Sequence, residues 1–110
     1  MARFMKGDFV VVPFPFSDLT QTRRRPAFVV ASLKGDDVIL CQITSQSLRD
    51  QYAISFNDRD FETGSLKQRS NIRPNRLFTA DSRIILYRAG NLKKEKVNEV
   101  VSEVVKIVRK

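Results

Sequence analysis

The fold is decided by residues 26–44, whose sequence is PAFVVASLKGDDVILCQIT. Two apolar runs, Pro26–Ser32 and Val38–Thr44, flank the polar segment Lys34–Asp37, which contains a glycine. β-Branched residues favour strands, whereas Gly and Asp favour tight turns. The stretch therefore predicts a β-hairpin, with Pro26 at the first position of a strand, where proline is tolerated.

Strands are also expected on both sides of this hairpin. Upstream, residues 9–16 predict a strand whose two prolines indicate that its later half lies at an edge or leaves the sheet, and residues 17–24 predict a polar loop. Downstream, residues 45–51 and 57–70 are polar. Further strands are predicted at residues 52–56, near Leu66, at residues 72–79 and at residues 84–87, with a short turn or helix around residues 81–82.

Near the C-terminus the spacing of the apolar residues becomes helical. Valines recur at i, i+3, i+4, i+7, i+8 and i+11, which predicts an α-helix from about Lys93 to Val108, with Asn91 as a candidate N-cap. The set is Val97, Val100, Val101, Val104, Val105 and Val108. We expect a mainly β chain, namely a small antiparallel β-barrel with a C-terminal helix, that forms a single domain over residues 1–110.

The composition excludes several kinds of chemistry. The chain has 110 residues, no histidine and one cysteine, which excludes Ser–His and Cys–His nucleophiles, imidazole metal sites and intrachain disulfides. Cys41 lies in an apolar run and is expected to be buried. No apolar stretch approaches the ~18–20 residues that span a bilayer, and the first eight residues contain no signal-peptide region. We therefore expect a soluble, cytoplasmic protein.

The basic excess lies mostly in the second half of the chain. Residues 1–55 hold 7 basic and 5 acidic side chains, whereas residues 56–110 hold 13 and 7. A formal net charge of +8 favours an anionic partner, most often a nucleic acid. The alternative is that the charge serves only solubility.

Three regions carry side chains suited to a nucleic acid. In the run Arg23–Arg25, at least one guanidinium should project over the sheet and suit a phosphate, although a solvated charge run is the alternative. In residues 42–46, hydroxyls and amides at a strand end suit a phosphate or a base edge, although such residues are also common in loops. The third region holds basic residues that suit a polyanion backbone. These are Lys67, Arg69, Arg73 and Arg76.

Aromatic and acidic residues give two weaker signals. Phe14, Phe16 and Phe61 are candidates for stacking on bases, and the first two are equally candidates for the core or a dimer surface. Asp58, Asp60 and Glu62 alternate along one segment, but the adjacent Arg59 and the loop setting favour solvation over a divalent cation. We expect no metal site and no cofactor.

Taken in order, these motifs resemble the MazF/PemK family of toxin endoribonucleases, the toxins of type II toxin–antitoxin systems. Gly7-Asp8 matches the family's opening before its first strand, and Arg25-Pro26 matches the pair that begins its second strand. Thr44 matches the threonine that ends the third strand. The segment Ser70–Thr79 and the C-terminal helix follow in the same order, so the resemblance covers essentially the whole chain.

The resemblance implies an SH3-like barrel, also found in CcdB-like toxins, that works as a homodimer. It implies sequence-selective, metal-independent cleavage of single-stranded RNA by attack of the ribose 2′-OH, with Arg25 and Thr44 as the catalytic pair. It also implies neutralisation by a cognate antitoxin, and a basic RNA site should attract an acidic, partly disordered peptide. The residues then expected to bind RNA are Arg23, Arg24, Ser45, Gln46, Phe16, Arg73 and Arg76.

The chemistry of this reaction agrees with the composition, because the 2′-OH is supplied by the RNA. Arg25 would stabilise charge on a phosphorane-like transition state, and Thr44 would hydrogen-bond a nonbridging oxygen. Because the pKa of arginine lies above about 12, Arg25 is a poor general base, and the base is unidentified. If the match is off by one residue, Arg24 takes the place of Arg25.

One departure and two rival functions remain open. Residues 19–24 contain no glycine and are basic, unlike the corresponding loop of many relatives, so the gating role of this loop and the cleavage sequence are not predicted. A noncatalytic CcdB-like gyrase inhibitor is one rival function. A plain nucleic-acid-binding barrel is the other.

Overall fold

The predicted hairpin forms the centre of the sheet in the computed structural model, which describes residues 4–15, 22–45, 50–66 and 68–110. Strand β2 (Thr22–Ser32) pairs antiparallel with β3 (Asp37–Thr44), with Ala27 opposite Gln42. Gly35 lies in the turn with a φ of 80°, a conformation that favours glycine. The hairpin prediction is therefore confirmed.

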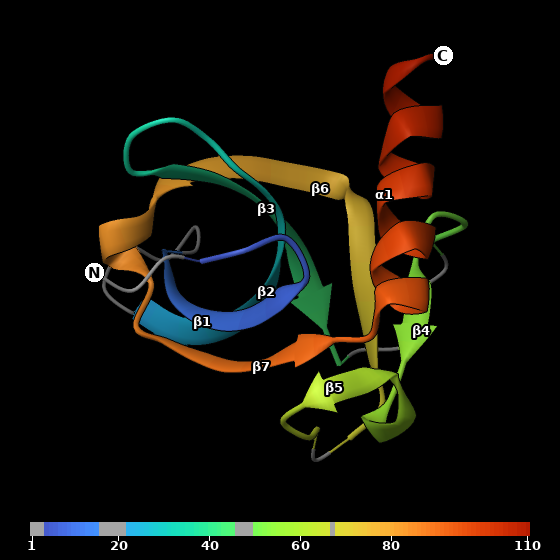
Figure 1. Cartoon of the computed structure of the whole chain (residues 1–110), viewed down its shortest axis with the longest axis horizontal. Helices are drawn as coiled ribbons and strands as arrows, with labels where there is room; N and C mark the ends of the chain where they lie inside the picture. Colours follow the sequence, from blue (N-terminus) through green and yellow to red (C-terminus); the bar gives the residue numbers. More distant parts are fainter. Residues whose placement is uncertain (1–3, 16–21, 46–49, 67) are drawn as a thin grey trace.

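Seven strands form one antiparallel sheet in the order β4-β6-β3-β2-β1-β7-β5, and the sheet curls into a half-barrel beside the helix α1 (Figure 1). The other strands are β1 (Asp8–Pro15), β4 (Ile54–Phe56), β5 (Phe61–Thr63), β6 (Ser70–Asp81) and β7 (Tyr87–Leu92). Two short 3₁₀ helices, η1 (Asp58–Asp60) and η2 (Ser82–Ile84), and α1 (Lys94–Val108) complete the described chain. The expected mainly β class with a C-terminal helix is confirmed.

The two faces of the sheet carry separate apolar clusters. The helix-side core joins residues such as Phe28 and Ile43 to Phe56 of β4 and Val100 of α1. The inner core lies on the other face of the strands, inside the curl, and includes Val12. Its other buried members are Val10, Ala27, Val29, Val38, Leu40 and Ile85. Side chains alternate between the faces of a strand, so the middle of the central strands is buried on both sides, as at Ala27–Val30 of β2.

The Gly7-Asp8 pair joins the start of β1 to its surroundings. Gly7 has a φ of 97°, and a Cβ there would lie 2.8 Å from Cγ2 of Val97 in α1. Asp8 is buried, and its Oδ2 lies 2.9 Å from Nε of Arg88 and accepts a 2.8 Å hydrogen bond from the backbone N–H of Met5. The motif therefore has a structural role. The missing side chain of Gly7 lets α1 pack close to the start of β1, and Asp8 fixes the N-terminal turn.

The strand pairing corrects two boundaries near the N-terminus. The sequence predicts a loop up to Arg24 and a strand from Pro26, but β2 begins at Thr22 because Pro15–Pro13 of β1 pair with Thr22–Arg24. The whole arginine run is therefore part of a strand. By contrast, the expectation that the later half of β1 lies at an edge is confirmed, because Pro13–Pro15 pair with β2 whereas β7 pairs only with Asp8–Val11.

Other expected elements shift along the chain. The strand predicted at residues 84–87 is wrong, because Ser82–Ile84 form a 3₁₀ turn capped by Asp81, and β7 begins only at Tyr87. The short strand predicted near Leu66 lies instead at Phe61–Thr63. These segments are exposed or short, so their pairing is decided by tertiary contacts more than by local pattern.

The predicted helix is confirmed as Lys94–Val108, but its predicted cap is wrong. Asn91 belongs to β7, and Lys93 occupies the N-cap position without a side-chain capping bond. Val97 and Val100 pack on the helix-side core, whereas Val108 is 66% exposed. In the described part of the chain, no helix has the length and apolarity needed to cross a membrane.

Candidate active site

At one end of the inner face, apolar side chains give way to polar ones. Arg25 lies next to Ala27 on this face of β2, because side chains two residues apart point to the same side. By the same alternation Gln42 and Thr44 follow Leu40 on β3. The inner face therefore ends in a guanidinium, an amide and a hydroxyl from neighbouring strands.

Strand β6 adds two more polar residues to this end. Asn71 and Arg73 flank Ile72, whose side chain lies in the helix-side core, so both point toward the inner face. Thr44 pairs with Asn71 and Gln42 pairs with Arg73 across β3 and β6. We call these five residues the inner polar row. It consists of Arg25, Gln42, Thr44, Asn71 and Arg73.

The register of the strands puts Arg25 and Thr44 beside the same end of the ladder between β2 and β3. The paired residues end with Ala27 opposite Gln42, and Arg25 and Thr44 each lie two residues beyond this pair on the same face of their strands. Thr44 is 6% exposed, whereas Arg25 is partly exposed with its Nε shielded from solvent. A guanidinium shielded from water attracts an anion more strongly than a fully solvated one.

Arg73 is held by a carboxylate that comes from outside the sheet. Its Nε lies 3.1 Å from Oδ2 of Asp50, and its Nη1 donates a 3.4 Å hydrogen bond to Oε1 of Gln42. The side chains of Arg73 and Asp50 are 17% and 10% exposed. The guanidinium is thus fixed from two sides while part of it still meets solvent.

Asp50 is fixed in turn by its own loop. Its Oδ1 accepts a 2.9 Å hydrogen bond from the backbone N–H of Tyr52, and its backbone carbonyl accepts one of 3.1 Å from Ala53. Burial raises the pKa of this carboxyl, but the bonds from Tyr52, Arg73 and Asn75 outweigh it, so the pKa lies below its ordinary value. Asp50 is therefore ionised at neutral pH.

The other residues predicted to bind RNA lie at different places. Arg24 is exposed and alternates with Arg25, so it points away from the inner face. Arg23 lies in β2 opposite Phe14. Ser45 is exposed immediately after β3, and Arg76 is exposed where the register between β3 and β6 is irregular. Phe16, Gln46 and Lys67 lie outside the described residues.

Three weaker candidates have structural roles. Phe61 is buried against Phe9, with ring centroids 5.4 Å apart, so the prediction that it stacks on bases is wrong. Cys41 is fully buried as predicted, and burial raises the pKa of its thiol to about 12. Asp60 accepts a 2.9 Å hydrogen bond from the backbone N–H of Asn57, which caps η1.

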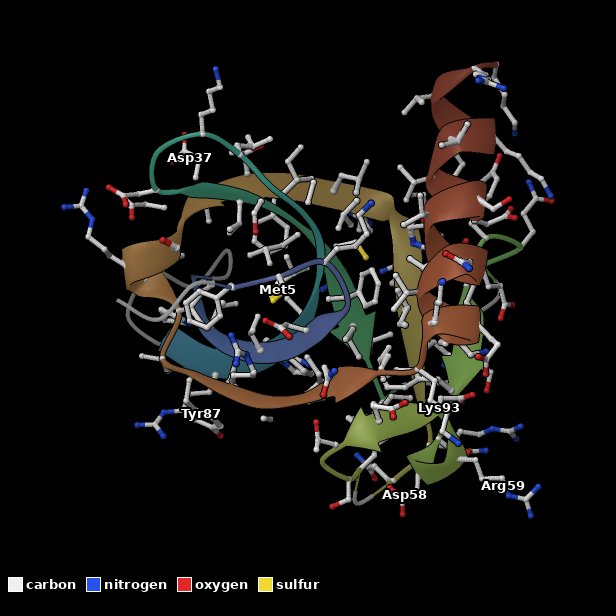
Figure 2. The ribbon with its side chains drawn as sticks, in the orientation of Figure 1. Met5, Asp37, Asp58, Arg59, Tyr87 and Lys93 are labelled. Atoms are coloured by element: carbon white, nitrogen blue, oxygen red, sulfur yellow. The ribbon has the colours of Figure 1, made fainter. Side chains whose placement is uncertain are left out.

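The acidic triplet does not converge on a common point. Asp58 and Arg59 project outward from η1, near Lys93 at the start of α1 (Figure 2). Asp58 accepts a hydrogen bond from the backbone N–H of Leu66. Among the residues that the structure describes, no group of three or more histidine, cysteine, aspartate or glutamate side chains is arranged to hold a metal ion.

The sequence pattern missed Asp50 and the asparagines of β6. Gln42 belongs to the segment 42–46 that the sequence predicts to suit a phosphate or a base edge, and alternation along β3 puts it on the face of Thr44. Asp50 stands in an irregular polar segment, and its pairing with Arg73 joins residues 23 positions apart. No local signal identifies such a pair.

Comparisons with known proteins agree on one family. A family model described as PemK-like, MazF-like toxin of type II toxin-antitoxin system matches residues 5–108. No curated protein matches the chain in sequence. Among solved structures, an endoribonuclease in complex with its cognate antitoxin from a mycobacterial species has a TM-score of 0.75 at 11% identity, over 97% of this chain and 96% of that one.

Two further structures show the same fold. MazE–MazF from Deinococcus radiodurans has a TM-score of 0.74 at 14% identity, over 96% of this chain and 95% of that one. The Mycobacterium tuberculosis toxin MazF-mt6 has a TM-score of 0.69 at 11% identity, over 93% of this chain and 95% of that one. At such identities the likeness establishes the fold, and the function has to be argued from the site.

Proposed function

The chain belongs to the PemK-like, MazF-like toxins of type II toxin–antitoxin systems, and we propose that it is an endoribonuclease that cleaves single-stranded RNA and thereby inhibits translation and growth. The observation that carries this proposal is the inner polar row, in which Arg25 and Thr44 come from adjacent strands onto one face. The folds of two endoribonuclease and MazF structures, each solved with its antitoxin, give further support.

The proposed reaction uses the RNA's own nucleophile. The 2′-oxygen attacks the neighbouring phosphorus and the bond from phosphorus to the 5′-oxygen breaks, which leaves a 2′,3′-cyclic phosphate and a 5′-OH. The proton lost by the 2′-OH goes to a base that is unidentified, and the 5′-oxygen gains a proton. The proposed step needs no metal ion and no protein nucleophile.

Each residue of the pair has a separate task in this proposal. Arg25 holds its charge beside the phosphate, stabilises the extra negative charge of the transition state, and can donate a proton to the leaving 5′-oxygen. Thr44 donates a hydrogen bond to a nonbridging oxygen.

RNA cleavage tests the proposal directly. The purified protein is incubated with a long single-stranded RNA in EDTA, and the new ends are mapped. We expect discrete cuts with 5′-OH ends, reduced by about 10²-fold or more in Arg25→Ala and in Thr44→Ala. Arg59→Ala serves as the matched control, because it removes an exposed charge that belongs to η1 and not to the inner polar row.

Either of two results would overturn the endoribonuclease proposal. Absence of cleavage would do so, and so would cleavage that both substitutions leave unchanged. Inhibition of gyrase supercoiling without RNA cleavage would favour a CcdB-like inhibitor. A salt-sensitive gel shift without cleavage would favour a plain nucleic-acid-binding barrel.

We further propose that the toxin acts as a homodimer and is neutralised by an acidic, partly disordered antitoxin. The net charge of +8 favours such a partner, and two similar structures were solved with antitoxins. Expression of the toxin should arrest growth, and co-expression of the neighbouring small open reading frame should relieve the arrest. Unrelieved arrest would contradict the antitoxin proposal, and a monomer in sedimentation equilibrium would contradict the dimer.

A further inference from the structure

The guanidinium of Arg73 differs from an ordinary phosphate-binding arginine because a carboxylate neutralises it. Asp50 lies 3.1 Å from its Nε, and both side chains are mostly buried, at 17% and 10% exposure. The low pKa of Asp50 keeps this carboxylate charged at neutral pH. With Gln42 as the third member, the group carries no net charge.

A neutral group of this kind suits a nucleobase better than a phosphate. Phosphate contacts depend on net positive charge and carry no sequence information, whereas base edges are uncharged and are recognised by directed hydrogen bonds. Asp50 removes the net charge but keeps the N–H donors, and it fixes the plane of the guanidinium. Fixed, directed donors with little net field are what base readout requires.

The hydrogen bonds also determine which atoms the group offers. Oε1 of Gln42 accepts from Nη1 of Arg73, so the amide N–H groups of Gln42 are left to point elsewhere. The remaining polar hydrogens of Arg73 are donors as well. A donor-rich group complements a base edge with two adjacent acceptors, which guanine offers at O6 and N7 and cytosine at O2 and N3.

The position of the group relates it to the proposed catalytic pair. Gln42 lies two residues before Thr44 on the same face of β3, and it is the diagonal neighbour of Arg25. Diagonal neighbours in an antiparallel sheet lie about 7–8 Å apart. A phosphate held by Arg25 and Thr44 would therefore bring the base of an adjoining nucleotide to Gln42 and Arg73.

We propose that Gln42, Asp50 and Arg73 form a base-reading site that selects guanine or cytosine next to the cleaved bond. Gln42 and Arg73 contact the base, and Asp50 is a positioning residue that acts through Arg73. This inference rests on the proposed endoribonuclease function, and it assigns Arg73 to base recognition, not to the RNA backbone.

The test is a map of all cut sites in a long RNA of mixed sequence. We expect the wild-type protein to require guanine or cytosine at one position beside the cut, and Gln42→Ala and Asp50→Asn to relax that requirement about tenfold. Asp50→Asn keeps the shape and one acceptor of the side chain, so it preserves the loop. RNA pools with inosine for guanosine, or with altered cytosine, show which of the two bases is read.

A matched variant separates base reading from general stability. Asp8→Asn weakens another ion pair of a buried aspartate with an arginine, in which Oδ2 lies 2.9 Å from Nε of Arg88, at the start of β1 and outside the inner polar row. We expect it to lower the unfolding temperature and to leave the base preference unchanged. If Asp8→Asn relaxes the preference as much as Asp50→Asn does, the positioning role is wrong.

Salt dependence separates a base contact from a phosphate contact. Each phosphate contact to a single strand contributes about 0.7 to the slope of log K against log salt. We expect the double variant Arg73→Gln/Asp50→Asn, which removes both charges of the pair, to leave the slope for an uncleavable 2′-O-methyl RNA unchanged, and Arg25→Ala to lower it. A lower slope in this double variant, with uniformly weaker binding to every sequence, would overturn the inference.

The two proposals fail in different ways. If the wild-type protein cleaves RNA and both variants keep its base preference, the base-reading site is wrong and the endoribonuclease stands. If the wild-type protein cleaves nothing, binding to four 2′-O-methyl RNAs that differ in one base decides the inference. Equal affinities would overturn it, whereas a preference for guanine or cytosine that is lost in Gln42→Ala would support it.

Discussion

Replacing Gly7 by alanine tests whether this glycine fixes α1 against the sheet. Both backbone groups of Gly7 already form hydrogen bonds. Its N–H donates to the carbonyl of Val29 and its carbonyl accepts from the N–H of Leu92, and each bond is 2.9 Å long. The backbone therefore has little freedom to move when a side chain is added. The new Cβ would lie 2.8 Å from Cγ2 of Val97.

The expected loss of stability has two parts. A φ of 97° is unfavourable for any residue with a Cβ, by about 1–2 kcal/mol. The contact with Val97 adds about 1–2 kcal/mol, because valine is stiff at χ1 and the helix must shift to make room. Together these lower the free energy of unfolding by about 2–4 kcal/mol, a large share of the stability of a domain this size.

Gly35→Ala is the matched control for the backbone part alone. Gly35 also has a positive φ, of 80°, but no atom lies within 4 Å of the position its Cβ would take. Urea unfolding followed by circular dichroism should show Gly7→Ala to be less stable than Gly35→Ala by about 1–2 kcal/mol. In thermal unfolding the same difference corresponds to about 4–8 °C in unfolding temperature. Adding Val97→Ala should reduce the cost of Gly7→Ala. Equal losses at both glycines, with no coupling to Val97, would refute the helix contact.

Other perturbations probe the site and the core. Arg25→Lys keeps the charge but loses the planar fork, so we expect RNA cleavage to fall about 10²-fold while folding is unchanged; near-normal cleavage would mean that Arg25 acts only as a point charge. The pKa of Asp50 is lowered on folding, so its stabilisation is present above the ordinary value of 3.8 and is lost as pH falls below it. The gap in stability between the wild type and Asp50→Asn should therefore narrow in acid, and a gap independent of pH would contradict the ion pair. Cys41, whose thiol pKa is raised to about 12 by burial, should resist alkylation at pH 8 in the native protein and react only in urea, and fast native alkylation would contradict the burial.

The sequence predicts the elements whose pattern is set by burial. Pro26–Ser32 and Val38–Thr44 are apolar because both faces of the central strands are covered, and the valines of α1 are periodic because one side packs on the sheet. The predicted bounds of β3 and α1 differ from the observed ones by about one residue, whereas β2 begins at Thr22, before the predicted start at Pro26. The strand predicted at residues 84–87 failed because its apolar residues are mostly exposed, as Ile84 is at 42%, so their pattern reflects no common buried face.

The candidate site was only partly predictable, for a different reason. Arg25 lies within β2 and Thr44 ends β3, and the alternation of side chains is enough to put them on one face. The partner of Arg73 depends instead on where the segment after Thr44 returns to the sheet. Asp50 meets Arg73 across 23 residues, and no periodicity extends through that segment. A charge count identifies Arg73 as a cation, whereas only the fold shows that a carboxylate neutralises it.

Because Asp50 neutralises Arg73, the capture of RNA and the selection among RNA sequences depend on different arginines, which a count of charges does not distinguish. The net charge of +8 is a property of the whole chain, and exposed residues such as Arg24, Arg69 and Arg76 contribute to it. Their field acts over about 8–10 Å at physiological salt and serves the capture of any polyanion. Selection among RNA sequences needs donors with fixed directions. The 3.1 Å bond from Arg73 to Asp50 fixes the guanidinium and at the same time neutralises its charge. A strongly basic toxin can therefore be selective, because the arginine that reads the sequence is not among those that attract the strand.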